Sequence, residues 1–566
     1  MKKILLIIWI ISFGFISSRA QELSDLNRSK EREKTDALTK CKVNKNNSSA
    51  NSKPNIVFFL VDDLGWSDVG YNGSVLYDTP NVDQFAKVGV RFDHAYAASH
   101  VCSPTRASIL TGKNPASIDL TDWLPGRSEF PFQKLNNADI NPHLPFEEIT
   151  LAEALREHGY RTGMYGKWHL GEDPSGPLEH GFDVRVPTDW NRGWPKSGFY
   201  YPFDMAGLEG EEGDYLTDVL TDEALKFINE NKDSPFFLYL SLFAVHDPIE
   251  GPLDLVEKYE QRLIEQGSQD GHPYILEGNP DTQNPFSREE LNALLDEEEY
   301  QGYRIFPNRL VKIKQHQDNA HFAAMVEAMD INFGRVISKL EELDLADNTI
   351  VIFYSDNGGM SGANFFRPSR IVHPSQEHRA FSTSNLPLRG AKGWLYEGGI
   401  RVPMVIKWPH QIDATITETD IPVNSYDFYP TIMDMVGLQM PEVQKVEGES
   451  LVSLMLGNAD ETERLRKRPL YWHFPQYSNH GQQSPGGAIR YGEYKLIEYF
   501  ENSGVLLFNV ESDPAEQNDL TDKRPDKVQE LRSMLHSWRE SVGANMPTDN
   551  PEFNPEYENN WDKWSP

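Results

Sequence analysis

The sequence predicts an α/β protein, in which a doubly wound, mostly parallel sheet is covered by helices and a smaller α+β subdomain follows. Three apolar runs predict the central strands of this sheet, at positions 55–61, 236–243 and 349–354. Apolar runs without alternation are typical of parallel strands that are buried on both faces. Polar residues follow each run, which places them at the carboxyl edge of the sheet, where sites form in α/β folds.

Helical patterns alternate with these strands, as a doubly wound fold requires. Thr150 and Glu153 form a capping box that opens a helix over residues 151–158, and Gly159 ends it. Residues 319–343 have a long apolar period of 3.6, which predicts a second helix.

Two segments of this domain are irregular. Residues 251–307 are charged and weakly periodic, and residues 361–384 are rich in Arg, His, Ser and Pro. Both are expected to be insertions near the carboxyl edge of the sheet. The sequence has no internal repeat, Walker loop, zinc-type cysteine pair or glycine-rich dinucleotide fingerprint, which argues against those functional classes.

Shorter elements replace the α/β pattern after about residue 440. Apolar runs at 494–497 and 505–509, separated by a turn, predict antiparallel strands, and a last helix is expected over 526–542. We therefore divide the folded body into an α/β domain at 54–440 and a C-terminal subdomain, with a small antiparallel sheet and a helix, at 441–566.

The first 20 residues have the three zones of a secretory signal peptide. Lys2 and Lys3 precede an apolar run at 4–15, and small residues precede a cleavage site after Ala20. We expect export to the periplasm or the extracellular space. A signal anchor is the alternative, but the run is shorter than the roughly 20 residues of a spanning helix. No later stretch predicts a stable membrane span.

Residues 21–53 are polar and lack an apolar period, so they are expected to form a flexible leader. One of the two cysteines, Cys41, lies in this leader. It does not directly follow the cleavage site, which argues against a lipoprotein anchor. A disulfide between Cys41 and Cys102 is not expected either, because the thiol of Cys102 would then be unavailable to the motif described below.

The net charge of −32 argues against nucleic acid as a partner, because phosphates are recognised by clustered lysines and arginines. If the substrate is itself an anion, the cations that bind it must gather in one pocket of an acidic surface.

A five-residue motif, CSPTR, places Cys102 at the predicted start of a helix. Ser103 is a good N-cap, Pro104 a good first helical residue, and Gly112 can end the helix. Unpaired backbone N–H groups, the helix dipole and the guanidinium of Arg106 would favour an anion beside this cysteine. For an isolated cysteine, the alternative is a buried free thiol.

Polar residues at the ends of the three predicted strands are expected to converge. Asp62 and Asp63 follow the first strand, His246 the second, and Asp356 and Asn357 the third. Four oxygen-bearing side chains suit Ca²⁺ or Mg²⁺ better than a soft metal. One such pair alone is usually a turn or a helix cap, so the metal prediction depends on both pairs meeting.

Cationic residues form the other half of the predicted site. Lys167 and His169 lie in the segment GKWHLG, and Lys392 lies in RGAK. Taken singly, each is explained by a surface charge or a buried histidine.

Six ordered motifs that include these residues resemble the sulfatases that carry a formylglycine nucleophile, members of the alkaline-phosphatase-like superfamily. The motifs lie at 61–65, 102–108, 166–171, 355–359, 387–392 and 397–403. The resemblance implies a large mixed, mostly parallel sheet sandwiched by helices, a catalytic domain at 54–440, and hydrolysis of sulfate esters. Every core position of the family pattern is matched.

The resemblance implies that Cys102 is oxidised to formylglycine (3-oxoalanine) by a formylglycine-generating or anaerobic sulfatase-maturating enzyme. A hydrated aldehyde has a second hydroxyl on the same carbon, and deprotonating that hydroxyl expels sulfate by C–O cleavage. One Ca²⁺ would be held by the following residues: Asp62, Asp63, Asp356, Asn357 and the modified Cys102.

The same resemblance assigns roles to the cations. Arg106 would steady the formylglycine, and His169 would take the proton from its second hydroxyl. Lys167, His246 and Lys392 would hold the sulfate oxygens. Either His246 or Lys392 would protonate the leaving oxygen, and the sequence does not choose between them.

The chain is most similar in character to bacterial sulfatases of sulfated polysaccharides and oligosaccharides, such as ulvan or carrageenan fragments. A phosphonate monoester or phosphodiester hydrolase of the same superfamily is one alternative, and a non-catalytic binder of sulfated glycans with an unmodified Cys102 is another. Sugar rings are expected to stack on Trp190, Trp194, Tyr200 and Tyr201. A second sulfate or a uronate is expected at Arg367, Arg370, His373 and His378.

Overall fold

A computed structural model describes residues 53–563, except 173, 189–192, 283, 365–370, 413–416 and 481–482. The predicted signal peptide, all but the last residue of the predicted leader, and Cys41 lie outside the described residues. Within the described part of the chain, no helix is long and apolar enough to cross a membrane.

The core of the molecule is an eight-stranded sheet with the strand order β12-β2-β11-β10-β1-β7-β5-β6. Only β11 runs antiparallel to its neighbours, which confirms the predicted mixed, mostly parallel sheet. The strands are β1 (Asn55–Val61), β2 (Val90–Phe92), β5 (Arg161–Gly166), β6 (Val184–Val186), β7 (Phe236–Ser241), β10 (Thr349–Ser355), β11 (Met404–Lys407) and β12 (Glu418–Thr419).

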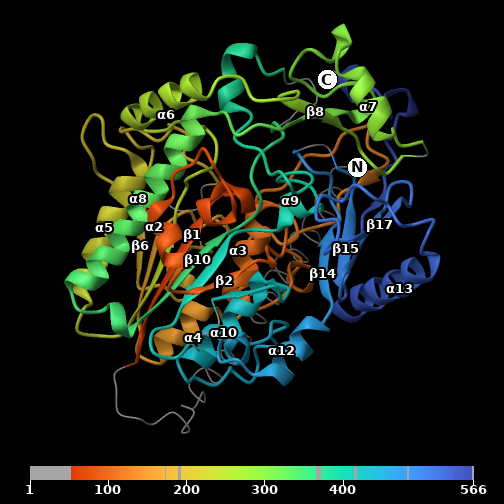
Figure 1. Cartoon of the computed structure of the whole chain (residues 1–566). Coiled ribbons are helices and arrows are strands. Elements are labelled where there is room, and N and C mark those ends of the chain that lie inside the picture. Colours follow the sequence, from red (N-terminus) through yellow and green to blue (C-terminus); the bar gives the residue numbers. More distant parts are fainter. Residues whose placement is uncertain are drawn as a thin grey trace, which may run out of the picture.

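Central strand β1 is buried on both faces, which explains why its sequence is apolar without alternation. Ile56, Phe58 and Leu60 face one core, and Val57 and Phe59 face the other. Figure 1 shows the helices that cover these cores on opposite sides of the sheet. The first core includes α3 (Cys102–Thr111), α4 (Leu151–Glu157) and α10 (Phe428–Met435), and the second includes α2 (Pro80–Ala86), α5 (Leu216–Glu230), α6 (Leu253–Gln266) and α8 (Ala320–Glu342).

The two predicted helices form where their end signals lie. Thr150 Oγ1 accepts a hydrogen bond from the Glu153 amide at 3.2 Å, and the Glu153 carboxylate accepts one from the Thr150 amide at 2.8 Å, which closes the capping box of α4. The side chain of Asn319 caps α8 by accepting from the amide of Phe322. These side chains satisfy N–H groups that the first helical turn leaves unpaired.

The C-terminal subdomain contains a second, antiparallel sheet in the order β14-β15-β16-β17, as predicted, and lies beside the main sheet in Figure 1. Its strands are β14 (Leu470–Phe474), β15 (Gly486–Tyr491), β16 (Tyr494–Tyr499) and β17 (Val505–Asn509). Helix α13 (Pro525–Val542) packs on this sheet through Leu531 and Leu535. Smaller elements of the described residues include β3 (Ala95–Tyr96), β4 (Leu135–Asn136), α9 (Glu397–Ile400), β13 (Val423–Asn424), α11 (Val452–Met455), α12 (Ala459–Arg466) and β18 (Thr548–Asp549).

The segment 251–307 is more regular than the sequence predicted. Its first part is the amphipathic helix α6, which buries Val256 and Tyr259 in the core beside α8 and therefore covers the sheet instead of forming an edge insertion. The remainder contains β8 (Tyr274–Glu277) and α7 (Arg288–Leu294), and β8 pairs with β9 (Val311–Lys314). The many acidic residues of α6 weaken the apolar period of its sequence. Only two of its residues, Val256 and Tyr259, are buried.

Candidate active site

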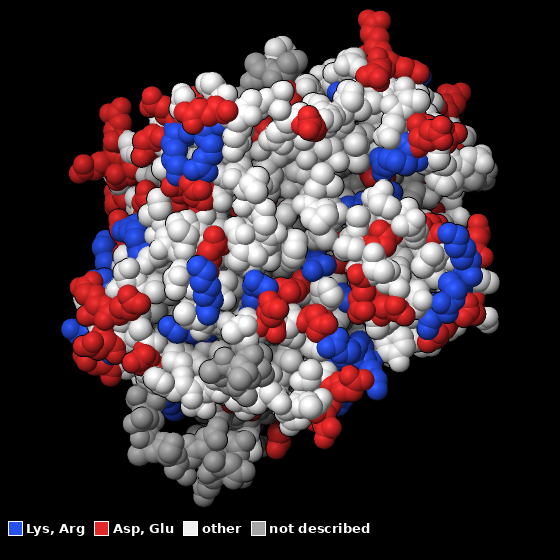
Figure 2. All heavy atoms as spheres, viewed as in Figure 1, with Lys and Arg blue, Asp and Glu red and all other residues white. Residues whose placement is uncertain are grey.

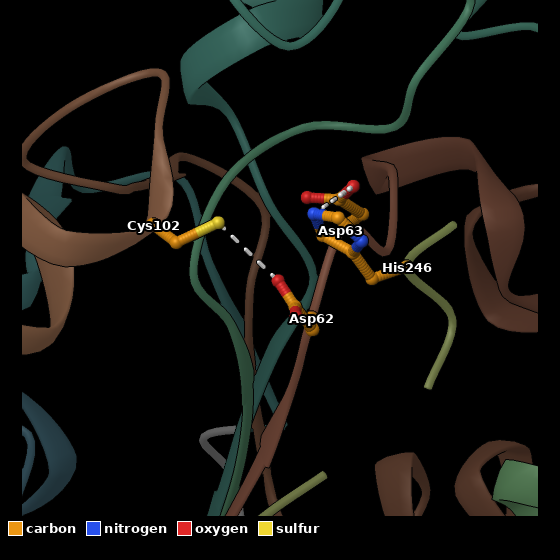
Figure 3. A group of neighbouring side chains, drawn as sticks. All are labelled: Asp62, Asp63, Cys102 and His246. Atoms are coloured by element: carbon orange, nitrogen blue, oxygen red, sulfur yellow. Dashed lines mark hydrogen bonds and ion pairs between the residues drawn. The ribbon is translucent and has the colours of Figure 1, made fainter. Parts of the chain in front are cut away.

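Four side chains from separate segments meet at the carboxyl edge of the main sheet. Asp62 and Asp63 follow β1, His246 follows β7, and Cys102 begins α3; one ligand atom from each lies within 4.8 Å of the others. Figure 3 shows the thiol of Cys102 pointing at Asp62, whose Oδ1 accepts a hydrogen bond from Sγ at 3.4 Å. The parallel strands bring these residues together because their carboxyl ends share one edge.

The second predicted metal pair joins this cluster. Val61 is in register with Ser355, so the residues that follow β1 and β10 are adjacent. The Asp63 amide donates to Asp356 Oδ1 at 3.2 Å, and Asn357 Nδ2 donates to Asp63 Oδ1 at 2.8 Å. Asn357 Oδ1 is buried without a hydrogen-bond partner among the described residues. An orphaned amide oxygen beside three carboxylates is a donor set that fits a hard cation.

Three buried cations each pair with one of the three carboxylates. Lys167 Nζ lies 2.6 Å from Asp62 Oδ2, and Lys392 Nζ lies 2.7 Å from Asp63 Oδ1. Arg106 Nη2 lies 2.7 Å from Asp356 Oδ2. A buried charge is tolerated when it is paired and hydrogen-bonded, and each of these groups has such a partner.

The pKa values of the carboxylates reflect the balance between burial, this pairing and the neighbouring charges. Burial opposes ionisation of Asp62, but Lys167 and His246 outweigh it and lower its pKa. Burial likewise opposes ionisation of Asp63, and Lys392 does most to lower its pKa. For Asp356, burial and the charge of Asp62 outweigh Arg106 and raise the pKa to about 6.

Arg106 is fixed by more than its ion pair. Its Nη1 donates to the carbonyl of Lys167 at 2.9 Å and to Ser241 Oγ at 2.5 Å. Ser241 is the last residue of β7, and its own hydroxyl donates to the Lys167 carbonyl at 2.7 Å. The sequence did not single out Ser241, because a serine at a strand end carries no signal of its own.

The pKa values of the two predicted histidines shift in opposite directions. Burial and Lys392 oppose protonation of His246, but Asp63 and Asp247 outweigh them and raise its pKa. Its Nδ1 lies 2.7 Å from Asp247 Oδ1, and its Nε2 lies 3.7 Å from Asp63 Oδ2, as Figure 3 shows for the second pair. Asp247 was missed in the sequence, although it directly follows His246.

His169 is held as a neutral ring. Its Nε2 lies 2.8 Å from the carbonyl oxygen of Leu124, which can only accept, so Nε2 carries the proton and Nδ1 has a lone pair. Nδ1 has no hydrogen-bond partner within the described ranges. Burial and Lys167 hold the pKa of His169 well below its usual range. A neutral ring with a free lone pair is able to accept a proton.

Part of this group of residues lines a pocket of about 250 Å³. One wall carries Cys102, His169, His246 and Lys392, and the C-terminal subdomain supplies Asn479 and His480. Among the described residues, the lining consists of Val101, Cys102, Trp123, His169, Gly193, Trp194, His246, Asp247, Asn364, Lys392, Asn479 and His480. No sequence pattern pointed to Asn479 or His480, because they lie far along the chain from the motifs.

The start of α3 differs from the prediction. The helix begins at Cys102, with Val101 as its extended N-cap residue, so the expectations that Ser103 is the N-cap and Pro104 the first helical residue are wrong. Ser103 Oγ instead accepts a hydrogen bond from the amide of Leu124 at 3.1 Å. The Ser103 hydroxyl therefore makes a tertiary contact instead of capping the helix, and Cys102 lies in the first turn of α3. Gly112, in the left-handed conformation at φ 69°, ends the helix as expected.

The residues expected to bind the rest of a glycan are only partly described. Trp194 lines the pocket with its residue 39% exposed, so it is available to a ligand. Tyr200 and Tyr201 do not line it; they pack against the core that contains α5, and the Tyr200 hydroxyl donates to the carbonyl of Gly251 at 3.2 Å. His373 is exposed, whereas Trp190, Arg367, Arg370 and the side chain of His378 lie outside the described residues.

The surface of the molecule carries many acidic side chains. Figure 2 shows acidic side chains spread over the visible face and gathered on the flank where α5, α6 and α8 lie. Lys167, Lys392 and Arg106 lie inside the site instead, where their side chains are at most 3% exposed and each is paired with a carboxylate.

Two family models match the chain. Residues 54–438 match the model described as Sulfatase. The chain belongs to the sulfatase family. Residues 391–542 also match the model described as N-sulphoglucosamine sulphohydrolase, C-terminal. Sulfatases are sulfuric ester hydrolases, so the site is that of an enzyme of this class.

Several known proteins are similar over most of their length. A sulfatase of Formosa agariphila is 28% identical over 88% of this chain and 90% of its own. An N-acetylglucosamine-6-O-sulfatase of Bacteroides thetaiotaomicron is 27% identical over 88% of each chain. The crystal structure of Ps i-CgsB matches with a TM-score of 0.62 at 26% identity, over 91% of this sulfatase and 95% of that chain.

Proposed function

We propose that this sulfatase is exported and hydrolyses sulfate esters of carbohydrates, with a formylglycine made from Cys102 and one bound Ca²⁺. The observation that carries the proposal is the position of Cys102 at the start of α3, beside the carboxylates of Asp62 and Asp63, which pair with the ammonium groups of Lys167 and Lys392. The predicted signal peptide is the support for export.

The residues present fit a calcium ion. Asp62, Asp63, Asp356, Asn357 and the modified Cys102 would hold it, because they offer hard oxygen donors and Asn357 Oδ1 has no other partner among the described residues. When bound, Ca²⁺ supplies Lewis acidity toward a sulfate oxygen. His246 belongs to the same cluster, but its nitrogen is a less suitable donor for Ca²⁺, and we assign it to the substrate.

The buried cations would bind the sulfate group. Each lysine ammonium has three N–H donors, so Lys167 and Lys392 can donate to sulfate oxygens while they stay paired with Asp62 and Asp63. Arg106 acts as a positioning residue, because its guanidinium is held by Asp356, Ser241 and the Lys167 carbonyl. Fixed donors of this kind stabilise charge that develops in the transition state.

Two histidines are placed for proton transfer. His169 lines the pocket and has a free Nδ1 lone pair, so it would accept a proton from the reacting group at residue 102. His246, supported by Asp247, would donate a proton to the leaving sugar oxygen; Lys392 is the other candidate acid.

Similarity to named relatives supports a carbohydrate substrate. One relative is an N-acetylglucosamine-6-O-sulfatase, and the solved Ps i-CgsB complex with k-i-k-neocarrahexaose matches with a TM-score of 0.61 at 25% identity. Trp123 and Trp194 in the pocket suit the apolar faces of a sugar ring. We propose sulfated polysaccharide or oligosaccharide fragments, such as those of carrageenan or ulvan, as substrates.

The mass of the peptide that contains Cys102 tests the mechanism. After co-expression with a formylglycine-generating or anaerobic sulfatase-maturating enzyme, oxidation to the aldehyde should lower its mass by about 18 Da. The matured protein should release sulfate from a panel of carrageenan, ulvan and N-acetylglucosamine sulfate fragments. The Cys102→Ala variant should release none, although its melting temperature should equal that of the wild-type protein.

The alternatives predict other results. Turnover of phosphonate monoesters or phosphodiesters, without sulfate release, would identify a hydrolase of those esters. An unmodified thiol in protein from its native source, together with glycan binding, would identify a non-catalytic binder and refute the proposal.

A further inference from the structure

His480 is a buried histidine whose polar atoms are not used by the protein. It lies in the segment between β14 and β15, lines the same pocket as Cys102 and Lys392, and is only 5% exposed. Neither ring nitrogen has a hydrogen-bond partner in the part of the chain that the structure describes. Buried polar side chains almost always have a partner, so an unpartnered one on a pocket wall indicates a ligand.

The backbone holds this histidine firmly. Its amide donates to Ser478 Oγ at 3.2 Å, and Ser478 Oγ donates back to its carbonyl at 2.9 Å. It also forms a β-bridge with Asn364.

Gly393, which follows Lys392, adopts φ +88°, and a Cβ there would lie 2.4 Å from the Cβ of His480. A glycine is therefore required at this contact. The close approach ties the position of His480 to that of Lys392.

The ring is neutral in this environment. Burial, with the charge of Lys392 as a second cause, holds the pKa of His480 well below its usual range. A neutral imidazole has one N–H donor and one lone-pair acceptor. It therefore differs from Lys167 and Lys392, which only donate.

We propose that His480 binds an unsubstituted hydroxyl group of the sugar that carries the scissile sulfate, and so selects sugars with a free hydroxyl beside the sulfate ester. A hydroxyl both donates and accepts, which matches a neutral imidazole, whereas a second sulfate or a carboxylate only accepts and would leave the lone pair of the ring facing an anion. This inference rests on the proposed function, because it needs a sulfated sugar in the pocket.

The test compares two substrates with the matured enzyme. One is the sugar sulfate that the panel identifies, and the other is 4-methylumbelliferyl sulfate, which has no sugar hydroxyl. In His480→Ala, the ratio of kcat/KM for the sugar sulfate to that for the aryl sulfate should fall about 10- to 100-fold, as expected for the loss of one or two buried hydrogen bonds. His480→Asn, which keeps a donor and an acceptor, should recover part of the ratio. His410→Ala, whose side chain is 71% exposed and does not line the pocket, is the matched control.

A deoxy analogue of the sugar sulfate identifies the hydroxyl. The wild-type enzyme should lose the same factor on the analogue that lacks the contacted hydroxyl, and His480→Ala should lose no more on it. An unchanged ratio or an equal fall on both substrates would overturn the role of His480. A matured wild-type enzyme that hydrolyses neither substrate, or only the aryl sulfate, would instead refute the proposed function.

Discussion

At the scale of single residues, the site is organised by buried charges of opposite sign. Each carboxylate of the proposed calcium set has its own cation: Lys167 for Asp62, Lys392 for Asp63 and Arg106 for Asp356. Removing one member of a pair would leave the other charge buried and unpaired, which is costly. Each ion pair therefore holds its two side chains in fixed positions. The carboxylates thereby present fixed oxygens, and the cations remain close enough to reach a bound sulfate.

Asp356→Asn should weaken both calcium binding and turnover. It removes one anionic donor and the partner of Arg106, and we expect kcat/KM to fall about 100-fold or more. In thermal unfolding, added Ca²⁺ should raise the melting temperature of the wild-type enzyme, because a ligand that binds only the folded state stabilises it. The variant should need a higher concentration of Ca²⁺ for the same rise.

Asp347→Asn is the matched control for this experiment, since its side chain is 88% exposed at the other end of β10. A wild-type enzyme whose activity and melting temperature resist chelation would show that the metal assignment is wrong.

At the scale of elements, the segments after the central strands are held by buried polar contacts. Asp68 ends the short turn of 3₁₀ helix that follows β1, and its carboxylate accepts from the Gly65 amide at 2.8 Å and from Thr383 Oγ1 at 2.6 Å. Thr383 belongs to the segment before the Lys392 motif, so this contact joins two sides of the site. Burial outweighs these hydrogen bonds and raises the pKa of Asp68 to about 7.

The free energy of unfolding should therefore fall as the pH rises toward 7. The ordinary pKa of an exposed aspartate is 3.8, so between that pH and about 7 the folded state binds a proton that the unfolded state has lost. Asp68→Asn removes this titration while its amide can still donate to Thr383 and accept from Gly65. Between pH 4 and pH 8, the free energy of unfolding of the variant should rise by about 2–4 kcal/mol relative to that of the wild-type protein. A stability difference that does not depend on pH, measured by urea unfolding, would contradict this assignment.

At the scale of the whole molecule, the C-terminal subdomain completes the pocket and is joined to the main domain by buried charges. Lys495 of β16 lies 3.0 Å from Glu397 of α9 and 3.1 Å from Glu516. The hydroxyl of Tyr96 donates to Glu397 at 2.7 Å, and Trp472 Nε1 donates to the carbonyl of Ala97 at 2.8 Å. This junction fixes where the segment with His480 meets the carboxyl edge of the main sheet.

Lys495→Met should therefore destabilise the protein strongly. Two buried glutamates would lose their common cation, and breaking a buried pair in this way costs about 3–5 kcal/mol. Lys467→Met, which removes a lysine that is 71% exposed, should leave the melting temperature unchanged. If both variants have the melting temperature of the wild-type protein, the ion pairs of Lys495 do not hold the C-terminal subdomain on the main domain.

The sequence by itself determined the main sheet, the strand-end carboxylates and the cationic motifs. These features follow from local patterns: β1 is apolar because both of its faces are buried, and Asp62 and Asp356 meet because parallel strands end at one edge. The tertiary structure alone decided the start of α3, the covering position of α6, the support of Arg106 by Ser241 and the pocket wall with His480. Those outcomes depend on contacts between residues far apart in the chain. The fold decides which partner lies near a given hydroxyl or imidazole, and local sequence patterns do not predict it.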